Sequence, residues 1–514
     1  MTNDKEHNPF SRRDFLKLCG LFPLAGLAPN LETKPTESSG ITRIGPTKLN
    51  ILILVLDTLT AHQMSLYGYQ RETTPNITRL AERATVYHNH QAAGNYTAPA
   101  TASMLTGAYP WSHRGLHSSA ALREEFAHRN IFALLPKDYY TLAYTHNSLA
   151  MSLLYRMKDD ITELLPFDVL ALQENTAAGK WFWNDLFLAG WGETIIRGVG
   201  HPPSSLFLSI LDPLRQRIRP EWVKKYGDLF PLGIPSANFH NRYFLLEDAM
   251  DWLITNLGEL PQPYLVYFHL MPPHEPYTPR VEFIDRFLDG EMFPQKPVHF
   301  FSDNIPEEKL QTLRREYDEY LAYADAEVGR LFEVLSQSGQ LENTYFILTS
   351  DHGQLFERGI HGHITPTLYA PLLHVPLLIA CPGQAKREDI HSLTSGVDLM
   401  PTLLNIAGVS APSWAEGSVL PGFEGAAKTE RSVFALEAKD SALQGLLRQA
   451  TLAMVQDQYK LVHYYGYPGF DNEYELYDLR ADPEEMVNLY EQSPDLAKEM
   501  CADMQPYLEK CKSK

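Results

Sequence analysis

Cysteine is scarce in this chain: its 514 residues include only Cys19, Cys381, Cys501 and Cys511. No two of them have the spacing of a zinc site, and although Cys501 and Cys511 could pair, four cysteines make no dense disulfide framework. The composition therefore argues against a disulfide-stapled module or a zinc finger. A chain of this length with 44% hydrophobic residues can bury a large core instead.

Positive charge is also sparse. The formal net charge is -19, and no stripe of Lys and Arg stands out along the sequence. Nucleic acid is therefore disfavoured as a partner, because neutralising phosphates needs clustered positive charge. An anionic substrate is not excluded, since a bound divalent cation can reverse the local sign of the charge.

Long apolar runs are missing where a membrane anchor would be expected. The stretch Leu18–Leu27 is far shorter than the ~20 residues that span a bilayer. It follows Ser11-Arg12-Arg13-Asp14-Phe15-Leu16-Lys17, which has the pattern of a twin-arginine export signal. The alternative is a chance Arg pair before a short buried helix. We expect residues 1–28 to be the signal, residues 29–47 a linker, and the protein to be periplasmic or extracellular, with membrane association left open.

Three apolar runs of strand length are present: Ile51–Leu56, Tyr264–Phe268 and Tyr345–Leu348. Uninterrupted apolar runs predict strands covered on both faces. Asp57 follows the first run, and Asp351-His352-Gly353 follows the third. Open α/β sheets place their chemistry at the carboxyl ends of strands, so we expect these carboxylates and this imidazole to hold one cation.

The segment Asn95–Gly107 is rich in hydroxyl side chains and predicts a turn followed by the start of a helix. Thr97 lies at this point and is a candidate nucleophile beside the metal. The alternative is that its hydroxyl caps the helix.

Several short motifs in one order resemble the N-terminal half of the sulfatase family, part of the alkaline-phosphatase-like superfamily. They are Asp57-Thr58-Leu59, Tyr67-Gly68-Tyr69, Thr74-Pro75-Asn76-Ile77 and Leu105-Thr106-Gly107-Ala108-Tyr109-Pro110. Asp351-His352-Gly353 resembles the second metal signature of the family. The resemblance covers residues 49–150 and 260–495. It implies a doubly wound, mostly parallel α/β sheet of alkaline-phosphatase/sulfatase type in residues 48–425 and a small C-terminal α+β subdomain in residues 426–514.

Residues 161–245 do not resemble the family core and are rich in aromatic side chains, among them Trp181-Phe182-Trp183. We expect an insertion that is an embellishment with its own small core. The alternative is that it caps the active site or meets a membrane surface, a lipid or a glycan.

Several positions depart from the family pattern. The family has Cys or Ser, oxidised to formylglycine, where this chain has Thr97. Only one acidic residue, Asp57, stands where many sulfatases have two. Thr97 cannot become that aldehyde, and Thr101 replaces the accompanying Arg. A sulfated threonine would lack the second hydroxyl that expels sulfate, whereas a phosphorylated threonine can be attacked by water or an alcohol. The departure therefore favours phosphorus chemistry.

The resemblance implies a role for each of several further residues. Asp57, Thr97, Asp351 and His352 would bind one divalent cation, Mn²⁺, Mg²⁺ or Ca²⁺, with Zn²⁺ tolerated. His274 would serve the leaving group, the alternative being a loop contact. Four basic residues would bind the substrate anion: His113, Arg114, His361 and His363. For His113 and Arg114 the alternative is a solvated position on the surface.

These observations predict a metal-dependent hydrolase or transferase that acts through Thr97 on a phosphoester or phosphodiester outside the cytoplasm. One alternative is a sulfuric ester hydrolase acting on a sulfated glycan or aryl ester. The other is a non-catalytic pseudoenzyme that binds an anionic glycan or lipid.

Overall fold

The computed structural model describes residues 49–116, 120–172, 221–237, 243–425, 431–439 and 445–512. The chain divides into two compact units, Met1–Thr47 and Lys48–Lys514, and every described residue belongs to the second. The predicted export signal, the predicted linker and Trp181-Phe182-Trp183 of the predicted insertion lie outside the described residues. Within the described part, no helix combines the length and the apolarity that a bilayer span requires.

The centre of the second unit is an eight-stranded sheet with the order β12–β2–β11–β8–β1–β7–β3–β4. All recorded strand pairs in this sheet are parallel except those of β11, which runs antiparallel to β2 and β8. This arrangement confirms the predicted mostly parallel sheet. The strands are β1 (Asn50–Leu56), β2 (Thr85–Gln91), β3 (Tyr140–Thr145), β4 (Glu163–Leu164), β7 (Tyr264–Leu270), β8 (Thr344–Thr349), β11 (Leu377–Ala380) and β12 (Glu388–Ser395).

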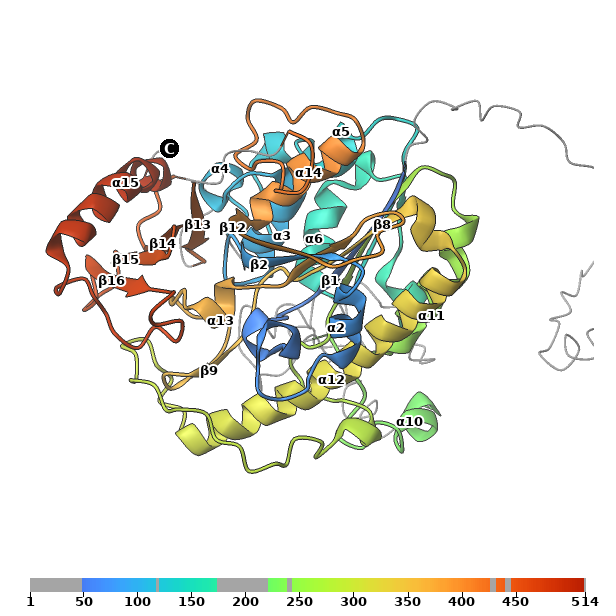
Figure 1. The fold of residues 1–514 in the computed structure, drawn as a ribbon, viewed down its shortest axis with the longest axis horizontal. Helices are drawn as coiled ribbons and strands as arrows, with labels where there is room; N and C mark the ends of the chain where they lie inside the picture. The colour runs from blue at the N-terminus through green and yellow to red at the C-terminus, as the bar shows by residue number, and fades with distance from the viewer. Residues whose placement is uncertain are drawn as a thin grey trace, which may run out of the picture. The chain divides into compact units, whose positions relative to one another are not determined.

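Helices cover both faces of this sheet, which explains why β1 is apolar at every position after Asn50 (Figure 1). Leu52, Leu54 and Leu56 pack into one hydrophobic core, and the alternate residues Ile51, Ile53 and Val55 pack into another. The first core is covered by α2 (Pro75–Ala81), α11 (Leu246–Asn256) and α12 (Glu307–Gln337), and the second by α3 (Thr97–Thr106), α5 (Ile131–Leu134), α6 (Ser148–Arg156) and α14 (Leu399–Ile406).

Shorter elements connect these layers. β5 (Ala171–Leu172) pairs with β6 (Tyr243–Phe244), so the two ends of the predicted insertion lie side by side. The other elements are α4 (Pro110–His113), α10 (Glu221–Tyr226), β9 (Leu355–Glu357), β10 (Ile360–Gly362) and α13 (Ala370–Leu373).

The C-terminal part contains an antiparallel four-stranded sheet and a closing helix, which confirms the predicted α+β subdomain. Its elements are β13 (Ser432–Glu437), β14 (Ala450–Gln456), β15 (Tyr459–Tyr465), β16 (Glu473–Asp478) and α15 (Pro494–Lys512). The suggested disulfide between Cys501 and Cys511 is wrong, because both thiols are free. Both residues lie on α15, and a separation of about three helical turns is too long for a disulfide.

Candidate functional site

Three neighbouring strands bring ionisable side chains to one edge of the sheet. Asp57 directly follows β1, His269 is the penultimate residue of β7, and Asp351 and His352 follow β8. The register pairs Val55 with both His269 and Thr349, so the carboxyl ends of the three strands lie at the same level. The side chains of all four residues are buried, with at most 1% of each residue exposed.

Two carboxylates and one imidazole converge at this edge. The ligand atoms of Asp57, Asp351 and His352 all lie within 4.8 Å of one another. His352 Nε2 lies 3.6 Å from Asp57 Oδ1 and 3.4 Å from Asp351 Oδ2. Neither of these carboxylate oxygens has a hydrogen-bond partner in the described part of the chain. Buried carboxylate oxygens without partners are costly, so this donor set fits a divalent cation.

The loop after β8 fixes the orientation of His352. Its Nδ1–H donates a 3.0 Å hydrogen bond to the carbonyl of Gly353, and its Nε2 faces the carboxylates. A Cβ atom at position 353 would lie 1.9 Å from the carbonyl oxygen of Pro371. Only glycine therefore fits where this loop packs against α13.

The electrostatics of the cluster indicate a deficit of positive charge. Burial and the charge of Asp57 raise the pKa of the Asp351 carboxyl. Burial also opposes ionisation of Asp57, but the pKa of Asp57 is lowered by the positive charge of His274 and by His269, whose Nε2 lies 3.4 Å from Asp57 Oδ2. Although burial opposes it, Asp351 and Asp57 raise the pKa of His269. A bound cation would supply the positive charge that the carboxylates otherwise obtain by favouring the protonated form of His269.

The Thr97 hydroxyl lies beside the carboxylates. Thr97 is the first residue of α3, and Tyr96 occupies the N-cap position, so the alternative role of Thr97 as a cap is not supported. Its Oγ1 accepts a 3.1 Å hydrogen bond from the side-chain amide of Asn147 and lies 3.5 Å from His352 Nε2. The same amide nitrogen also donates to Asp57 Oδ2 at 2.5 Å.

His274 and His363 are also brought to the cluster. The ring of His363 lies 4.5 Å from that of His352 and 4.9 Å from that of His274, between ring centroids. Burial and then the charges of His352 and His274 hold the pKa of His363 well below its usual range. Gln354 Oε1 lies 2.7 Å from His363 Nδ1, and Gln354 Nε2 donates to the Tyr277 hydroxyl at 2.9 Å.

His361 lies farther from the carboxylates than His363 does. Its Nε2 contacts the Tyr277 hydroxyl at 3.0 Å and lies 3.5 Å from a carboxylate oxygen of Glu275. His361 is thus linked to the cluster by hydrogen bonds through Tyr277 and Gln354.

The structure does not bring His113 and Arg114 to the cluster. Both ring nitrogens of His113 are engaged within the core, at 2.9 Å from Ser103 Oγ and 2.9 Å from the backbone N–H of Gly115. Burial, followed by the neighbouring charge of Arg123, lowers the pKa of Arg114. Their role in substrate binding remains a prediction that these contacts do not support.

Two residues of the cluster, His269 and Asn147, were not identified from the sequence. His269 Nε2 lies 3.4 Å from Asp57 Oδ2 and 3.6 Å from Asp351 Oδ2. Asn147 caps α6 through its Oδ1, which accepts from the backbone N–H groups of Leu149 and Ala150. A histidine inside an otherwise apolar strand, and an asparagine just after a strand, are the signals that could have identified them.

Comparison with known proteins identifies the family of this chain. The Sulfatase family model matches residues 49–409, and the model described as N-sulphoglucosamine sulphohydrolase, C-terminal, matches residues 359–514. A choline-sulfatase of Rhizobium meliloti is 26% identical over 478 residues, which cover 86% of this chain and 83% of the relative. A multifunctional alkaline phosphatase superfamily protein of Trinickia caryophylli is also 26% identical, over 86% of this chain and 91% of its own length.

A solved structure agrees with the fold. The phosphonate monoester hydrolase of Agrobacterium radiobacter aligns with a TM-score of 0.64 and 18% identity, over 90% of this chain and 95% of that protein. The mostly parallel sheet with its C-terminal subdomain is therefore of the alkaline-phosphatase/sulfatase type. The chain belongs to the sulfatase family and is an ester-cleaving hydrolase.

Proposed function

We propose that this hydrolase cleaves or transfers phosphoesters or phosphodiesters outside the cytoplasm, with Thr97 as its nucleophile. The observation that carries the proposal is the position of the Thr97 hydroxyl, hydrogen-bonded to Asn147 and 3.5 Å from His352 Nε2. It lies at the N-terminus of a ten-residue helix, where backbone N–H groups and the helix dipole favour an anionic group.

Asp57, Asp351 and His352 would hold the divalent cation, together with the Thr97 oxygen. When bound, the cation favours an ionised hydroxyl and neutralises charge on the transferring group. The two imidazoles beside the carboxylates, His352 and His269, move the preferred metal toward Mn²⁺ or Zn²⁺ and away from Ca²⁺. Asn147 would fix the rotamer of Thr97 through its 3.1 Å hydrogen bond.

The reaction would proceed in two steps. Thr97 Oγ1 loses its proton to solvent and bonds to phosphorus while the bond from phosphorus to the leaving oxygen breaks, and His274 is the predicted donor of a proton to that oxygen. Water or an acceptor alcohol then loses a proton and bonds to phosphorus while the bond from phosphorus to Thr97 Oγ1 breaks, and Oγ1 regains a proton as the product leaves. The methyl group on the Thr97 Cβ precludes the aldehyde hydrate on which formylglycine sulfatases depend.

Sulfate ester hydrolysis is the second candidate. The similarity to a choline-sulfatase along 86% of the chain supports it. The residue at position 97 is the observation against it, because a threonine sulfate has no second hydroxyl to expel the sulfate.

The test uses purified protein loaded with Mn²⁺ or Zn²⁺ and three substrates: p-nitrophenyl phosphate, bis-p-nitrophenyl phosphate and p-nitrophenyl sulfate. We expect turnover of a phosphorus ester, loss of about 10³-fold or more in kcat for Thr97→Ala, and a phosphate adduct on Thr97 by mass spectrometry after rapid quenching. Thr106→Ala is the control, because Thr106 is a buried threonine of the same helix whose hydroxyl donates to the Ala102 carbonyl. Turnover of the sulfate alone, or full activity of Thr97→Ala, would overturn the proposal.

Export is part of the same proposal and has its own test. Replacing Arg12 and Arg13 together by lysine should keep the protein in the cytoplasm, as measured by cell fractionation. Unchanged export of this variant would contradict the twin-arginine route.

A further inference from the structure

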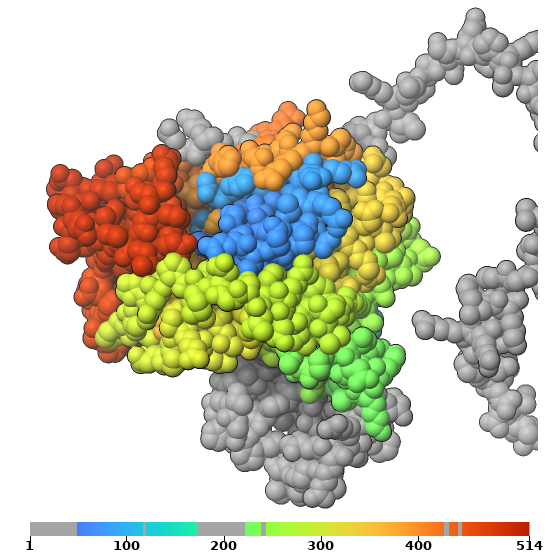
Figure 2. Space-filling model, turned by 60° about the horizontal axis from the view of Figure 1, so that its bottom comes forward, coloured from blue at the N-terminus to red at the C-terminus, as the bar shows by residue number. Residues whose placement is uncertain are grey.

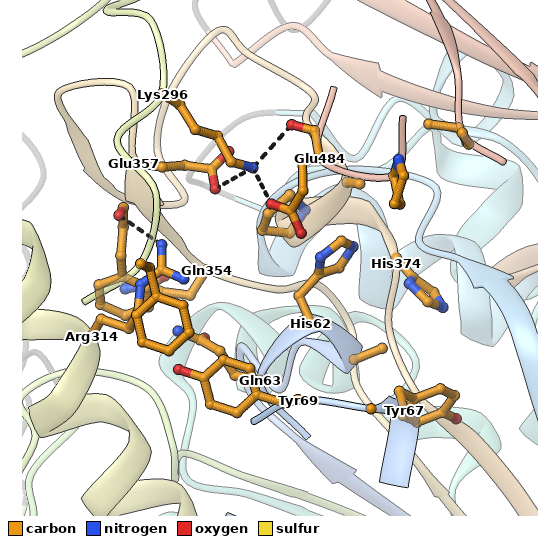
Figure 3. A pocket seen from close by; sticks show the side chains of 18 of the residues that line it. His62, Gln63, Tyr67, Tyr69, Lys296, Arg314, Gln354, Glu357, His374 and Glu484 are labelled. Carbon is orange, nitrogen blue, oxygen red and sulfur yellow. Dashed lines mark hydrogen bonds and ion pairs between the residues drawn. The ribbon is translucent and has the colours of Figure 1, made fainter. Parts of the chain in front are cut away.

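A cavity of about 500 Å³ lies next to Gln354 in the loop after β8 (Figure 3). Its wall includes Gln354 but none of Asp57, Thr97, Asp351 or His352. Much of the wall comes from residues 61–70 after β1, the segment from Phe293 to Arg314, and the C-terminal subdomain, and the end of β2, residues 354–357 and residues 370–374 complete it. Figure 2 shows the first three of these parts, in blue, yellow-green and red, meeting on one face of the molecule. The volume is in the range of small-molecule sites in proteins.

Three cationic side chains line this cavity, and two of them are neutralised. Lys296 Nζ lies 2.8 Å from carboxylate oxygens of both Glu357 and Glu484. Lys460 Nζ lies 2.7 Å from Glu485 Oε1.

Arg314, on α12, is the third cation and forms no ion pair within 4.0 Å among the described residues, although its charge opposes the rise that burial causes in the pKa of the buried Asp318 carboxyl on the same helix. It donates a 3.0 Å hydrogen bond to the carbonyl of Phe356 and lies over the ring of Phe293, 4.5 Å from its centroid. Its Nε–H is buried and has no partner among the described residues. A buried guanidinium N–H without an acceptor favours an anionic ligand such as a carboxylate or a sulfate group.

Other residues of the cavity wall suit a ligand that donates hydrogen bonds. Gln63 is 3% exposed, and its Oε1 has no partner within the described part of the chain. His62 lies beside it (Figure 3), and burial, followed by the neighbouring His374 and Lys296, holds its pKa well below the usual range. The neutral ring and the unpaired amide oxygen both suit hydroxyl groups. A bare sulfate ion carries no donor and would leave Gln63 Oε1 unsatisfied.

We propose that this cavity is a saccharide site that binds an acidic sugar, with Arg314 on its carboxylate or sulfate and Gln63 accepting from a hydroxyl. Tyr67 and Tyr69 line the same cavity and offer apolar surface to the ring carbons of a sugar. The site is separate from the proposed ester-cleaving centre and does not depend on which ester that centre cleaves.

Binding is tested by calorimetry on the full chain with a panel of hexuronate-containing and sulfated disaccharides, with cellobiose and lactose as neutral probes, and with inorganic sulfate. We expect at least one acidic disaccharide to bind more tightly than the neutral probes and inorganic sulfate. Arg314→Gln should weaken that binding about tenfold or more. Arg315→Gln is the matched control, because Arg315 is the next residue of α12, does not line the cavity and faces Glu319 at 3.7 Å.

Gln63→Met provides a second variant that removes the amide with little change in volume, and it should also weaken binding. Thr97→Ala should leave binding unchanged while it abolishes ester cleavage, which separates this inference from the proposed function. The inference is overturned if no acidic disaccharide binds, if inorganic sulfate binds equally well, or if folded Arg314→Gln and Gln63→Met bind as the unmodified protein does.

Discussion

Asn147 donates a 3.1 Å hydrogen bond to the Thr97 hydroxyl, and the oxygen of the same amide caps α6. Asn147→Ala removes both contacts and also the hydrogen bond from this amide to Asp57 Oδ2. Loss of the cap should cost about 1 kcal/mol of stability, and loss of the contact with Thr97 should lower kcat about 10²-fold, because the nucleophile is no longer held in one orientation. Steady-state kinetics with the preferred phosphorus ester and urea denaturation measure the two effects.

Asn130 provides the matched control, because its side chain caps α5 by accepting from the Ala133 N–H. Asn130→Ala should lose similar stability and keep kcat. Equal kcat values for the two variants would show that Asn147 serves only as a helix cap.

His269 should contribute to cation affinity. His269→Gln removes an imidazole whose Nε2 lies within 3.6 Å of both carboxylates, so we expect metal binding to weaken about 10- to 100-fold. Competition with a chromophoric chelator measures the affinity. His146→Gln is the control, because His146 is equally buried but stacks on Phe244. The same loss in both variants would point to general damage to the fold.

Removal of the cation should lower thermal stability, since the two buried carboxylates then repel each other. At a cation concentration of 100 times Kd, binding contributes about 2.7 kcal/mol, which chelator-treated protein should lack. Asp351→Asn relieves the repulsion that raises the pKa of Asp351. Its Tm without metal should therefore be at least that of the metal-free parent, and added Mn²⁺ or Zn²⁺ should not raise it. A Tm that metal raises equally in both proteins would rule out Asp351 as a ligand.

Acid should destabilise the fold through buried histidines outside the cluster. Burial lowers the pKa of His113 and of His90 from 6.5 to about 3. The unfolded chain therefore binds more protons than the folded one between these values, so stability is present above pH 6.5 and is lost as the pH falls toward 3. At pH 5 each of these histidines should cost about 2 kcal/mol relative to pH 7.5.

His113→Gln tests this claim and the predicted substrate role of His113 together. The loss of stability between pH 7.5 and pH 5 in urea denaturation should shrink by about 2 kcal/mol, and KM should not change. His128→Gln, with a side chain that is 67% exposed, should leave the acid sensitivity as it was. A raised KM with unchanged acid sensitivity would instead support the substrate role.

The strands that hold the cluster were predictable because a parallel sheet covered on both faces requires unbroken apolar runs. β1 shows this directly, since alternate residues enter different cores. Asp57 and Asp351-His352 were predictable for the same reason, because each follows such a run. Thr97 was found through its motif, and its place at the start of α3 agrees with the predicted turn and helix.

The contributions of His269 and Asn147 could not be predicted in this way. They depend on β7 and β3 lying next to β1 in the order β1–β7–β3, which the chain order of the strands does not specify. His113 failed for a different reason. Its imidazole lies in the core against α3, with Nε2 at 2.9 Å from Ser103 Oγ.

Thr58, which follows Asp57, has a φ of 63°, an unfavourable conformation for a β-branched residue. Its carbonyl accepts a 2.8 Å hydrogen bond from the buried Tyr317 hydroxyl, which helps to hold the backbone in this form. Asp and Asn tolerate left-handed backbone far better than Thr does. The backbone conformation at position 58 therefore suits a second acidic residue, and Thr58→Asp should make the centre more negatively charged with little backbone strain.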